Sequence, residues 1–215
     1  MNETIKSFIE DLKQRSDVLG IILFGSYARG NNRPNSDVDL VVILSDGYSR
    51  TVEHKNGQAF EIIYTTEKGA FDYWESHRDD AAELWEVAKI LYDKDGAVES
   101  LKIKIQEIIS VGKKAIDKSE LEQLRFDAED QIRYVEDIIL SDSTTANLIL
   151  TNKIFILTGR FFDIKQMWSP SPKQRLAKIK DLNQDLYILL ESFYRDGETL
   201  ENKLIFAKNI IKLIF

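Results

Sequence analysis

No cysteine occurs among the 215 residues of this sequence, and histidine occurs only twice, as His54 and His77. The lack of thiols excludes disulfides, thiolate zinc sites, iron–sulfur clusters and cysteine nucleophiles. With only two histidines, a multi-histidine metal site or a Ser-His-Asp triad is disfavoured. Carboxylates and hydroxyls are therefore the side chains in which to look for chemistry.

Long apolar runs and signal features are also missing. No stretch of about 18 apolar residues is present, so no segment is expected to span a membrane. The first residues, MNETIKSFIEDLKQR, form an amphipathic helical pattern instead of the apolar core of a signal peptide. We expect a cytoplasmic protein with no membrane partner.

The net charge of −7 arises entirely in the first part of the chain. Residues 1–96 contain 11 Lys and Arg against 18 Asp and Glu, whereas residues 97–215 contain 18 of each. Nucleic-acid binding requires a basic face, so this distribution disfavours a nucleic-acid partner. An acidic region instead suits a site that concentrates divalent cations.

Glycine is scarce after residue 97, where only three of the ten glycines lie. In the first part, apolar patterns predict helices at residues 3–16, 69–77 and 80–87, and strands at 18–24, 37–44, 48–54, 58–65 and 89–93. Lys55-Asn56-Gly57 is typical of a hairpin turn between the third and fourth strands.

From about residue 97 the apolar residues recur at helical spacing. Residues 143–168 are apolar nearly all round, which predicts a helix buried in the middle of a bundle. Ser171-Pro172 begins another helix, with one apolar stripe from Leu176 to Phe193. We predict an α+β fold in which a small mixed-sheet domain, residues 1–96, is followed by a C-terminal helical bundle domain, residues 97–215.

Two carboxylates lie two residues apart at the start of the second predicted strand. Side chains at this spacing point to the same face, so Asp37 and Asp39 project side by side. At about 4 Å they repel by roughly 4 kcal/mol for an effective dielectric constant of about 20. A magnesium ion would offset this repulsion. The spacing alone also allows a solvent-exposed pair at a strand start.

Glu61 is the third candidate carboxylate, in the apolar strand AFEIIYT. An ionised carboxylate there is costly unless it is paired, bound to a metal or turned to solvent at a sheet edge. These alternatives remain open from the sequence.

Gly25-Ser26 ends the first predicted strand, ten residues before Asp37. A glycine there lets the backbone approach phosphate oxygens, and Ser26 can donate from its amide and its hydroxyl. The spacing of Gly25 and Gly30 is that of a P-loop, but Asn31-Asn32 follows where Lys-Ser/Thr is required.

Taken together, LFGSYARGNNRPNSDVDLVVIL followed by FEIIY resembles the DNA-polymerase-β-like nucleotidyltransferase superfamily over about residues 18–65. The later segments LYDKDGAVESL and WSPSPKQRLAKI resemble the bacterial branch that modifies aminoglycoside and lincosamide antibiotics. That branch joins a nucleotidyltransferase domain to a helical bundle.

The resemblance implies metal-dependent transfer of a nucleoside monophosphate, AMP from ATP, with release of pyrophosphate. Asp37 and Asp39 would hold two magnesium ions, and Glu61 would complete the metal site or act as the general base. The nucleotide-binding residues implied are Gly25, Ser26, Ser36 and Lys173. Lys173 follows Ser171-Pro172 at a predicted helix start, a position that favours anions, although a solvated lysine is equally compatible with the sequence.

The acceptor implied by the resemblance is a hydroxyl of a small molecule, such as an aminoglycoside or lincosamide antibiotic. The alternative is an antitoxin-type nucleotidyltransferase that modifies a protein partner. RNA tailing is disfavoured by the acidic charge, and a non-catalytic binding module by the presence of all three carboxylates. The choice among ATP, GTP and CTP and a homodimeric state remain open.

Overall fold

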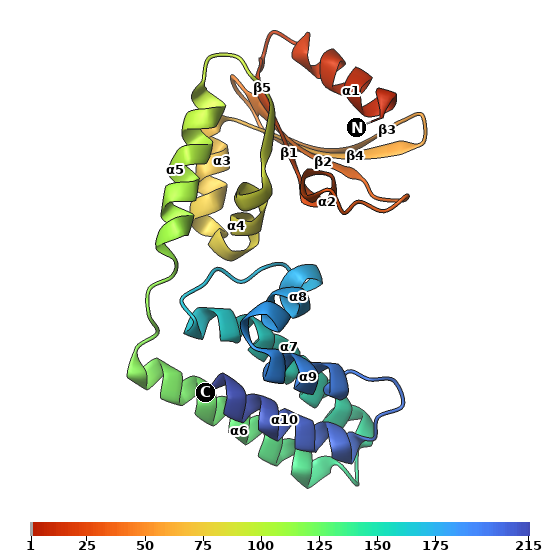
Figure 1. Ribbon diagram of the computed structural model, residues 1–215, viewed down its shortest axis with the longest axis vertical. Helices are drawn as coiled ribbons and strands as arrows, with labels where there is room; N and C mark the ends of the chain where they lie inside the picture. The colour runs from red at the N-terminus through yellow and green to blue at the C-terminus, as the bar shows by residue number, and fades with distance from the viewer. Residues whose placement is uncertain (1) are drawn as a thin grey trace. The chain divides into compact units, whose positions relative to one another are not determined.

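The computed structural model describes residues 2–215, except the side chain of Asp80. The chain divides into two compact units, Met1–Val111 and Gly112–Phe215 (Figure 1). A five-stranded mixed sheet lies in the first unit, and the second unit is helical. The predicted α+β fold is confirmed.

The first unit contains the whole sheet, in the strand order β3-β4-β2-β1-β5. Its elements are α1 (Glu3–Lys13), β1 (Val18–Phe24), α2 (Gly25–Arg29), β2 (Val38–Leu44), β3 (Ser49–Lys55), β4 (Gln58–Thr65), α3 (Glu67–Ser76), α4 (Arg78–Val87), β5 (Lys89–Asp93) and α5 (Ala97–Val111). All five predicted strands are present, within a residue of their expected bounds.

Only the central β2–β4 pair is parallel; the other three strand pairs are antiparallel. The β3–β4 hairpin turns at Asn56 and Gly57, whose φ angles of 50° and 79° are positive. Asn-Gly adopts such angles readily, so the predicted hairpin turn is confirmed. The parallel pair aligns Val38 with Phe60 and Leu40 with Ile62.

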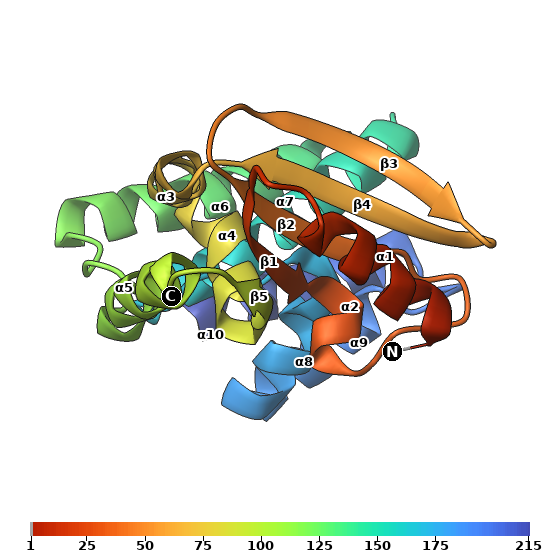
Figure 2. The same cartoon turned by 90° about the horizontal axis from the view of Figure 1, so that it is seen from above.

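Helix α1 covers one face of the sheet. Its apolar stripe packs against alternate residues of β2 and β4, and the rings of Phe8 and Phe60 stack with their centroids 4.0 Å apart. Leu40 and Ile62 are fully buried in this core. Helices α3, α4 and α5 lie at the opposite face, as Figure 2 shows from above. The even-numbered residues of β2 therefore face α1, and the odd-numbered ones face away from it.

Helix α5 belongs to the first unit because it packs directly on β1. A Cβ atom at Gly20 would lie 2.1 Å from Cγ2 of Val98, so the absence of a side chain at Gly20 makes room for α5. The units therefore meet at residues 111 and 112, later than the boundary at residues 96 and 97 expected from the change in periodicity. Helical periodicity reports the local conformation but not the core in which a helix is buried.

The second unit is built from five helices around one apolar core. They are α6 (Lys118–Ile138), α7 (Ser143–Ile164), α8 (Pro172–Leu182), α9 (Gln184–Phe193) and α10 (Leu200–Ile214). The stripe predicted as one helix is interrupted at Asn183, whose side chain accepts a hydrogen bond from the Leu186 amide at 3.0 Å and caps α9. No helix in residues 2–215 is long and apolar enough to cross a membrane.

Helix α7, which the sequence predicts to be buried in the middle of a bundle, is buried on one side and exposed on another. Leu150 and Ile154 are fully buried, but Leu148 is 69% exposed and Ile156 is 45% exposed. An apolar composition on every side does not show which side faces the core, because that depends on where α6 and α10 pack.

The two leucines of α7 provide a matched test of this packing. Leu150→Ala should lower the free energy of unfolding by about 2–5 kcal/mol, because it leaves a cavity in the core. Leu148→Ala should change it by no more than about 0.5 kcal/mol. Urea unfolding followed by far-ultraviolet circular dichroism measures both, and equal losses would contradict the observed orientation of α7.

Candidate functional site

Three carboxylates meet where β2 and β4 begin. The parallel register places Asp39 directly beside Glu61, and Asp37 immediately precedes β2. One ligand oxygen from each of Asp37, Asp39 and Glu61 lies within 4.8 Å of the others. Asp37 is exposed, and the other two are half-buried. The structure thus brings together all three carboxylates singled out in the sequence.

Gly25 packs against this cluster from the other side of β2. Phe24 is the register partner of Asp39, so the turn from β1 into α2 passes over that carboxylate. Gly25 has φ +64°, and a Cβ atom there would lie 1.9 Å from Oδ2 of Asp39. Only glycine allows the backbone to approach Asp39 this closely. Ser26 follows in the first turn of α2, and its role in phosphate binding remains a prediction.

Glu61 is paired with Arg50 of β3, a residue that the sequence analysis did not identify. The Arg50 Nε atom donates to Glu61 Oε1 at 2.8 Å, and Nη2 donates to the same oxygen. Hydrogen bonding to Glu61 raises the pKa of the Arg50 guanidinium above its ordinary value. The predicted hairpin could have indicated this pair, because its register places Arg50 diagonally across from Glu61.

Ser36 is held in place by groups from both sides of the carboxylate cluster. Its hydroxyl accepts a hydrogen bond from the Arg33 amide at 2.8 Å, and its carbonyl accepts one from Gln58 Nε2 at 3.0 Å. The Tyr27 hydroxyl donates to Gln58 Oε1 at 3.1 Å. This network links α2, the segment before Asp37 and the start of β4, and thereby fixes the direction in which the chain enters β2. The part of Ser36 in nucleotide binding remains a prediction.

Arg29 has a structural partner. Its Nη1 atom donates to Glu83 Oε1 at 2.6 Å, and both side chains are largely buried, at 24% and 14% exposed. This ion pair connects α2, which begins at the Gly25 turn, to α4.

Lys173 lies in the second unit, in the first turn of α8, and is exposed. The assignment of Lys173 to the nucleotide remains a prediction.

The carboxylate cluster is suited to a divalent cation. Carboxylate oxygens are the ligands that magnesium and manganese prefer, and three of them converge here on one sheet face. The Asp39 carboxylate lies where a side chain at residue 25 would be, so glycine at this position lets Asp39 remain beside the other two carboxylates. The residues present therefore fit a metal centre.

Comparisons with known proteins show which family and which fold the chain is similar to. The model of the nucleotidyltransferase domain family matches residues 5–141, more than half of the chain. A protein of Methanocaldococcus jannaschii, provisionally named a protein adenylyltransferase, is 43% identical over 69 residues, which are 30% of this chain and 47% of that protein. The chain thus matches about half the length of this curated relative.

One solved structure shows a similar fold. The nucleotidyltransferase-like protein of Exiguobacterium sibiricum 255-15 superposes with a TM-score of 0.51, covering 99% of this chain and 73% of that protein. The sequence identity is 13%, so this likeness concerns the fold alone.

Substitution of two glycines with positive φ distinguishes the effect of backbone strain from that of a clash with the Asp39 carboxylate. Gly25→Ala and Gly30→Ala both force alanine into a left-handed conformation, at a cost of about 1–2 kcal/mol each. Only the alanine at residue 25 meets Asp39, since nothing lies within 4 Å of a Cβ at Gly30. We expect Gly25→Ala to weaken Mn²⁺ binding by about tenfold or more and Gly30→Ala to leave it nearly unchanged. Titration followed by electron paramagnetic resonance measures the affinity, and equal affinities in the two variants would contradict the expected clash.

Proposed function

The chain belongs to the nucleotidyltransferase family of the DNA-polymerase-β type, and from this premise we propose that it transfers AMP from ATP to an acceptor hydroxyl. The observation that carries the proposal is the convergence of Asp37, Asp39 and Glu61 beside the Gly25 turn. A family assignment alone would also cover a chain that had lost its carboxylates. Here all three are present and their oxygens are close enough to share a metal centre.

Asp37 and Asp39 would hold magnesium, two ions in the proposed reaction, with Glu61 as a third ligand or as the base. When bound, the ions would offset the negative charge that develops on the triphosphate and lower the pKa of the attacking hydroxyl. Gly25 and Ser26 would hold the triphosphate through backbone and hydroxyl donors, with Ser36 and Lys173 as further nucleotide contacts. Pyrophosphate would leave on the Gly25 side of Asp39.

Glu61 is proposed to take the proton from the acceptor hydroxyl. Both hydrogen bonds from Arg50 fall on Oε1, which leaves Oε2 to accept that proton. The pairing with Arg50 also offsets the cost of holding a half-buried carboxylate in an apolar strand. Arg50 would therefore orient Glu61 through one carboxylate oxygen, and the other oxygen would act as the base.

Two acceptor classes are proposed. The motif resemblance supports a hydroxyl of a small molecule such as an aminoglycoside or lincosamide antibiotic. The similarity to a protein provisionally named a protein adenylyltransferase supports a protein hydroxyl as the second candidate. Pyrophosphate release with ATP, GTP and CTP, measured against a panel of antibiotics and against candidate partner proteins, distinguishes the two. Transfer to a protein but to none of the small molecules would establish the second class.

Substitution of Asp39 tests the proposed metal ligands. Asp39→Asn should abolish AMP transfer and magnesium-dependent ATP binding, because an amide cannot supply the negative charge that the metal requires. The matched control is Asp46→Asn, which removes the same charge beyond the other end of β2, where the side chain is exposed and accepts from the Gly47 amide. Isothermal titration calorimetry with Mg–ATP and a pyrophosphate assay measure both variants. Normal turnover in a folded Asp39→Asn protein would refute the mechanism.

Substitution of Glu61 distinguishes its two proposed roles. If Glu61 is the base, Glu61→Gln should lower turnover by about 10²–10⁴-fold while the affinity for Mg–ATP changes little. If Glu61 is mainly a metal ligand, Mg–ATP affinity should fall together with turnover. Glu53→Gln on the neighbouring strand is the control, because Glu53 is exposed. If Glu61→Gln changes neither turnover nor Mg–ATP affinity, Glu61 is neither the base nor a metal ligand.

A further inference from the structure

A cavity of about 320 Å³ lies beside the carboxylate cluster, between the sheet and helices α3 and α4. Val41 and Ile63 form its floor, each two residues beyond Asp39 and Glu61 on the same strands. Residues two apart on a strand share a face, so the cavity and the carboxylates lie on the same side of the sheet. Arg50 belongs to both, since it lines the cavity and donates to Glu61.

The position of the cavity across the sheet assigns it to one side of the proposed reaction. Gly25 follows β1, and the strand order continues through β2 with Asp39, β4 with Glu61 and β3 with Arg50. In a displacement at phosphorus the attacking and leaving oxygens are roughly in line, on opposite sides of the phosphorus. If the triphosphate lies at Gly25, the attacking hydroxyl comes from the β4 and β3 side. The cavity lies on that side, because its lining includes Ile63 of β4 and Arg50 of β3.

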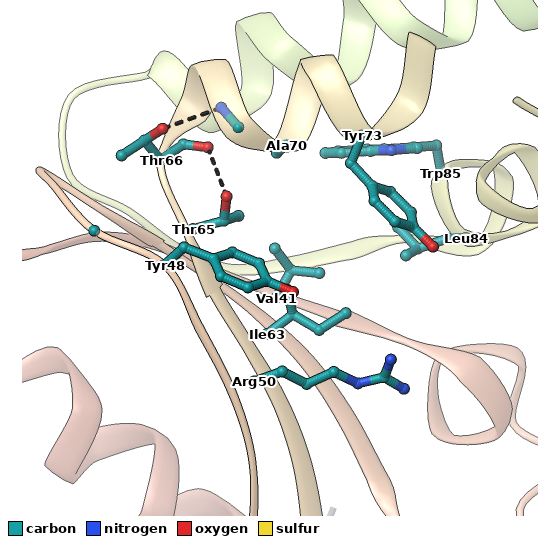
Figure 3. A pocket seen from close by; sticks show the side chains of 12 residues that line it. Val41, Tyr48, Arg50, Ile63, Thr65, Thr66, Ala70, Tyr73, Leu84 and Trp85 are labelled. Atoms are coloured by element: carbon teal, nitrogen blue, oxygen red, sulfur yellow. Dashed lines mark hydrogen bonds between the residues drawn. The ribbon is translucent and has the colours of Figure 1, made fainter. Parts of the chain in front are cut away.

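The cavity walls are aromatic and apolar. Figure 3 shows Tyr48 and Tyr73 projecting into the space between α3 and the strands that carry Val41 and Ile63. The Tyr73 ring is itself supported by stacking on His77, with centroids 4.4 Å apart. Trp85 is buried, with 2% of its surface exposed, and closes one wall.

The charge of the lining excludes one kind of occupant. Arg50 is the only charged side chain among the described residues that line the cavity, and it is a cation. The Thr66 hydroxyl accepts from the Gly69 amide at 3.0 Å, and the Thr65 hydroxyl donates to the Thr66 carbonyl at 3.4 Å, so both are engaged locally. A charged group on the ring would find no carboxylate among these residues, whereas the hydroxyl end of the acceptor would lie next to Glu61. A neutral ring would bury apolar surface against the walls.

We propose that this cavity is the acceptor site and takes a small alcohol whose hydroxyl is attached to an uncharged, ring-bearing group. The proposal rests on the proposed AMP transfer. The ring would lie between Tyr48 and Tyr73, and the hydroxyl would reach past Arg50 to Glu61. Its volume is at the lower end of the range of about 300–1,000 Å³ for ligand pockets, which suits one small ring system.

The proposed transfer of AMP needs no reactant besides ATP and the alcohol. The alcohol oxygen forms a bond to the α-phosphorus of ATP, and the bond from that phosphorus to the bridging oxygen of pyrophosphate breaks. The hydroxyl proton passes to Oε2 of Glu61, and pyrophosphate leaves with the electron pair of the broken bond. The products are the AMP ester of the alcohol and pyrophosphate.

Benzyl alcohol and 4-(aminomethyl)benzyl alcohol are matched probes, because they share the ring and the hydroxyl, and the second carries an ammonium group at the opposite end of the ring at pH 7. Methyl carbon–proton correlation spectra of the full chain report binding at Val41, Ile63 and Ala70. We expect benzyl alcohol to shift these resonances with an affinity at least about fivefold higher than the charged alcohol, because the walls around the ring offer the ammonium group no carboxylate partner. Equal or tighter binding of the charged alcohol, or no shift at these methyl groups, would overturn the proposal.

Filling the cavity provides the complementary test. Ala70→Leu places a larger side chain in it on a buried face of α3, and Ala177→Leu makes the same change on an exposed turn of α8. Ala70→Leu should weaken benzyl alcohol binding by about tenfold while Mg–ATP affinity remains normal, and Ala177→Leu should change neither. If Ala70→Leu does not fold, Tyr48→Ala serves instead, because Tyr48 is 73% exposed and its removal does not disturb the core.

Mass spectrometry for the AMP ester of benzyl alcohol separates failure of this inference from failure of the proposed function. Ester formation that is lost in Ala70→Leu supports both. Ester formation that Ala70→Leu leaves unchanged overturns the acceptor site alone. If no variant transfers AMP to any acceptor in the panel, the proposed function fails, and with it the assignment of the cavity to an acceptor.

Discussion

The parallel pairing of β2 with β4 is the constraint on which the candidate site depends. It places Asp39 beside Glu61, and a slip of one residue would turn one carboxylate to the opposite face. The register is held from the other side of the sheet, where Leu40 and Ile62 are fully buried under α1. Moving either strand by one residue would expose these apolar side chains and bury the carboxylates among them. The core beneath α1 thus fixes the geometry on the face that carries the chemistry.

Holding three carboxylates together requires compensating charge, and the structure supplies part of it. Arg50 pairs with Glu61 from the edge strand β3, and the Gly25 backbone passes close to Asp39. At separations of about 4 Å each unscreened pair of carboxylates would repel by several kcal/mol at an effective dielectric constant of about 20. A divalent cation is the natural complement to Asp37 and Asp39, because one ion can interact favourably with both. The cluster is therefore arranged for binding a cation more than for stabilising the fold.

The two faces of the sheet are covered differently, and this difference explains the cavity. Helix α1 packs closely on its face, whereas α3 and α4 leave a space above Val41 and Ile63 next to Glu61. The acidic net charge of the first part of the chain does not extend to the cavity walls, where Arg50 is the only charged side chain among the described residues. The apolar walls suit an uncharged ring in the proposed acceptor.

The amino-acid sequence by itself determined the local elements. Apolar alternation, Asn56-Gly57 and the two-residue spacing of Asp37 and Asp39 predict the strands, the hairpin and the shared face, because these depend on neighbouring residues. Tertiary structure alone decided which core contains α5, which side of α7 is exposed, and that Gln58 holds the carbonyl of Ser36. It also created the cavity between α3 and β4. These features join segments far apart in the chain, and packing between such segments leaves no periodic signal in the sequence that could reveal it.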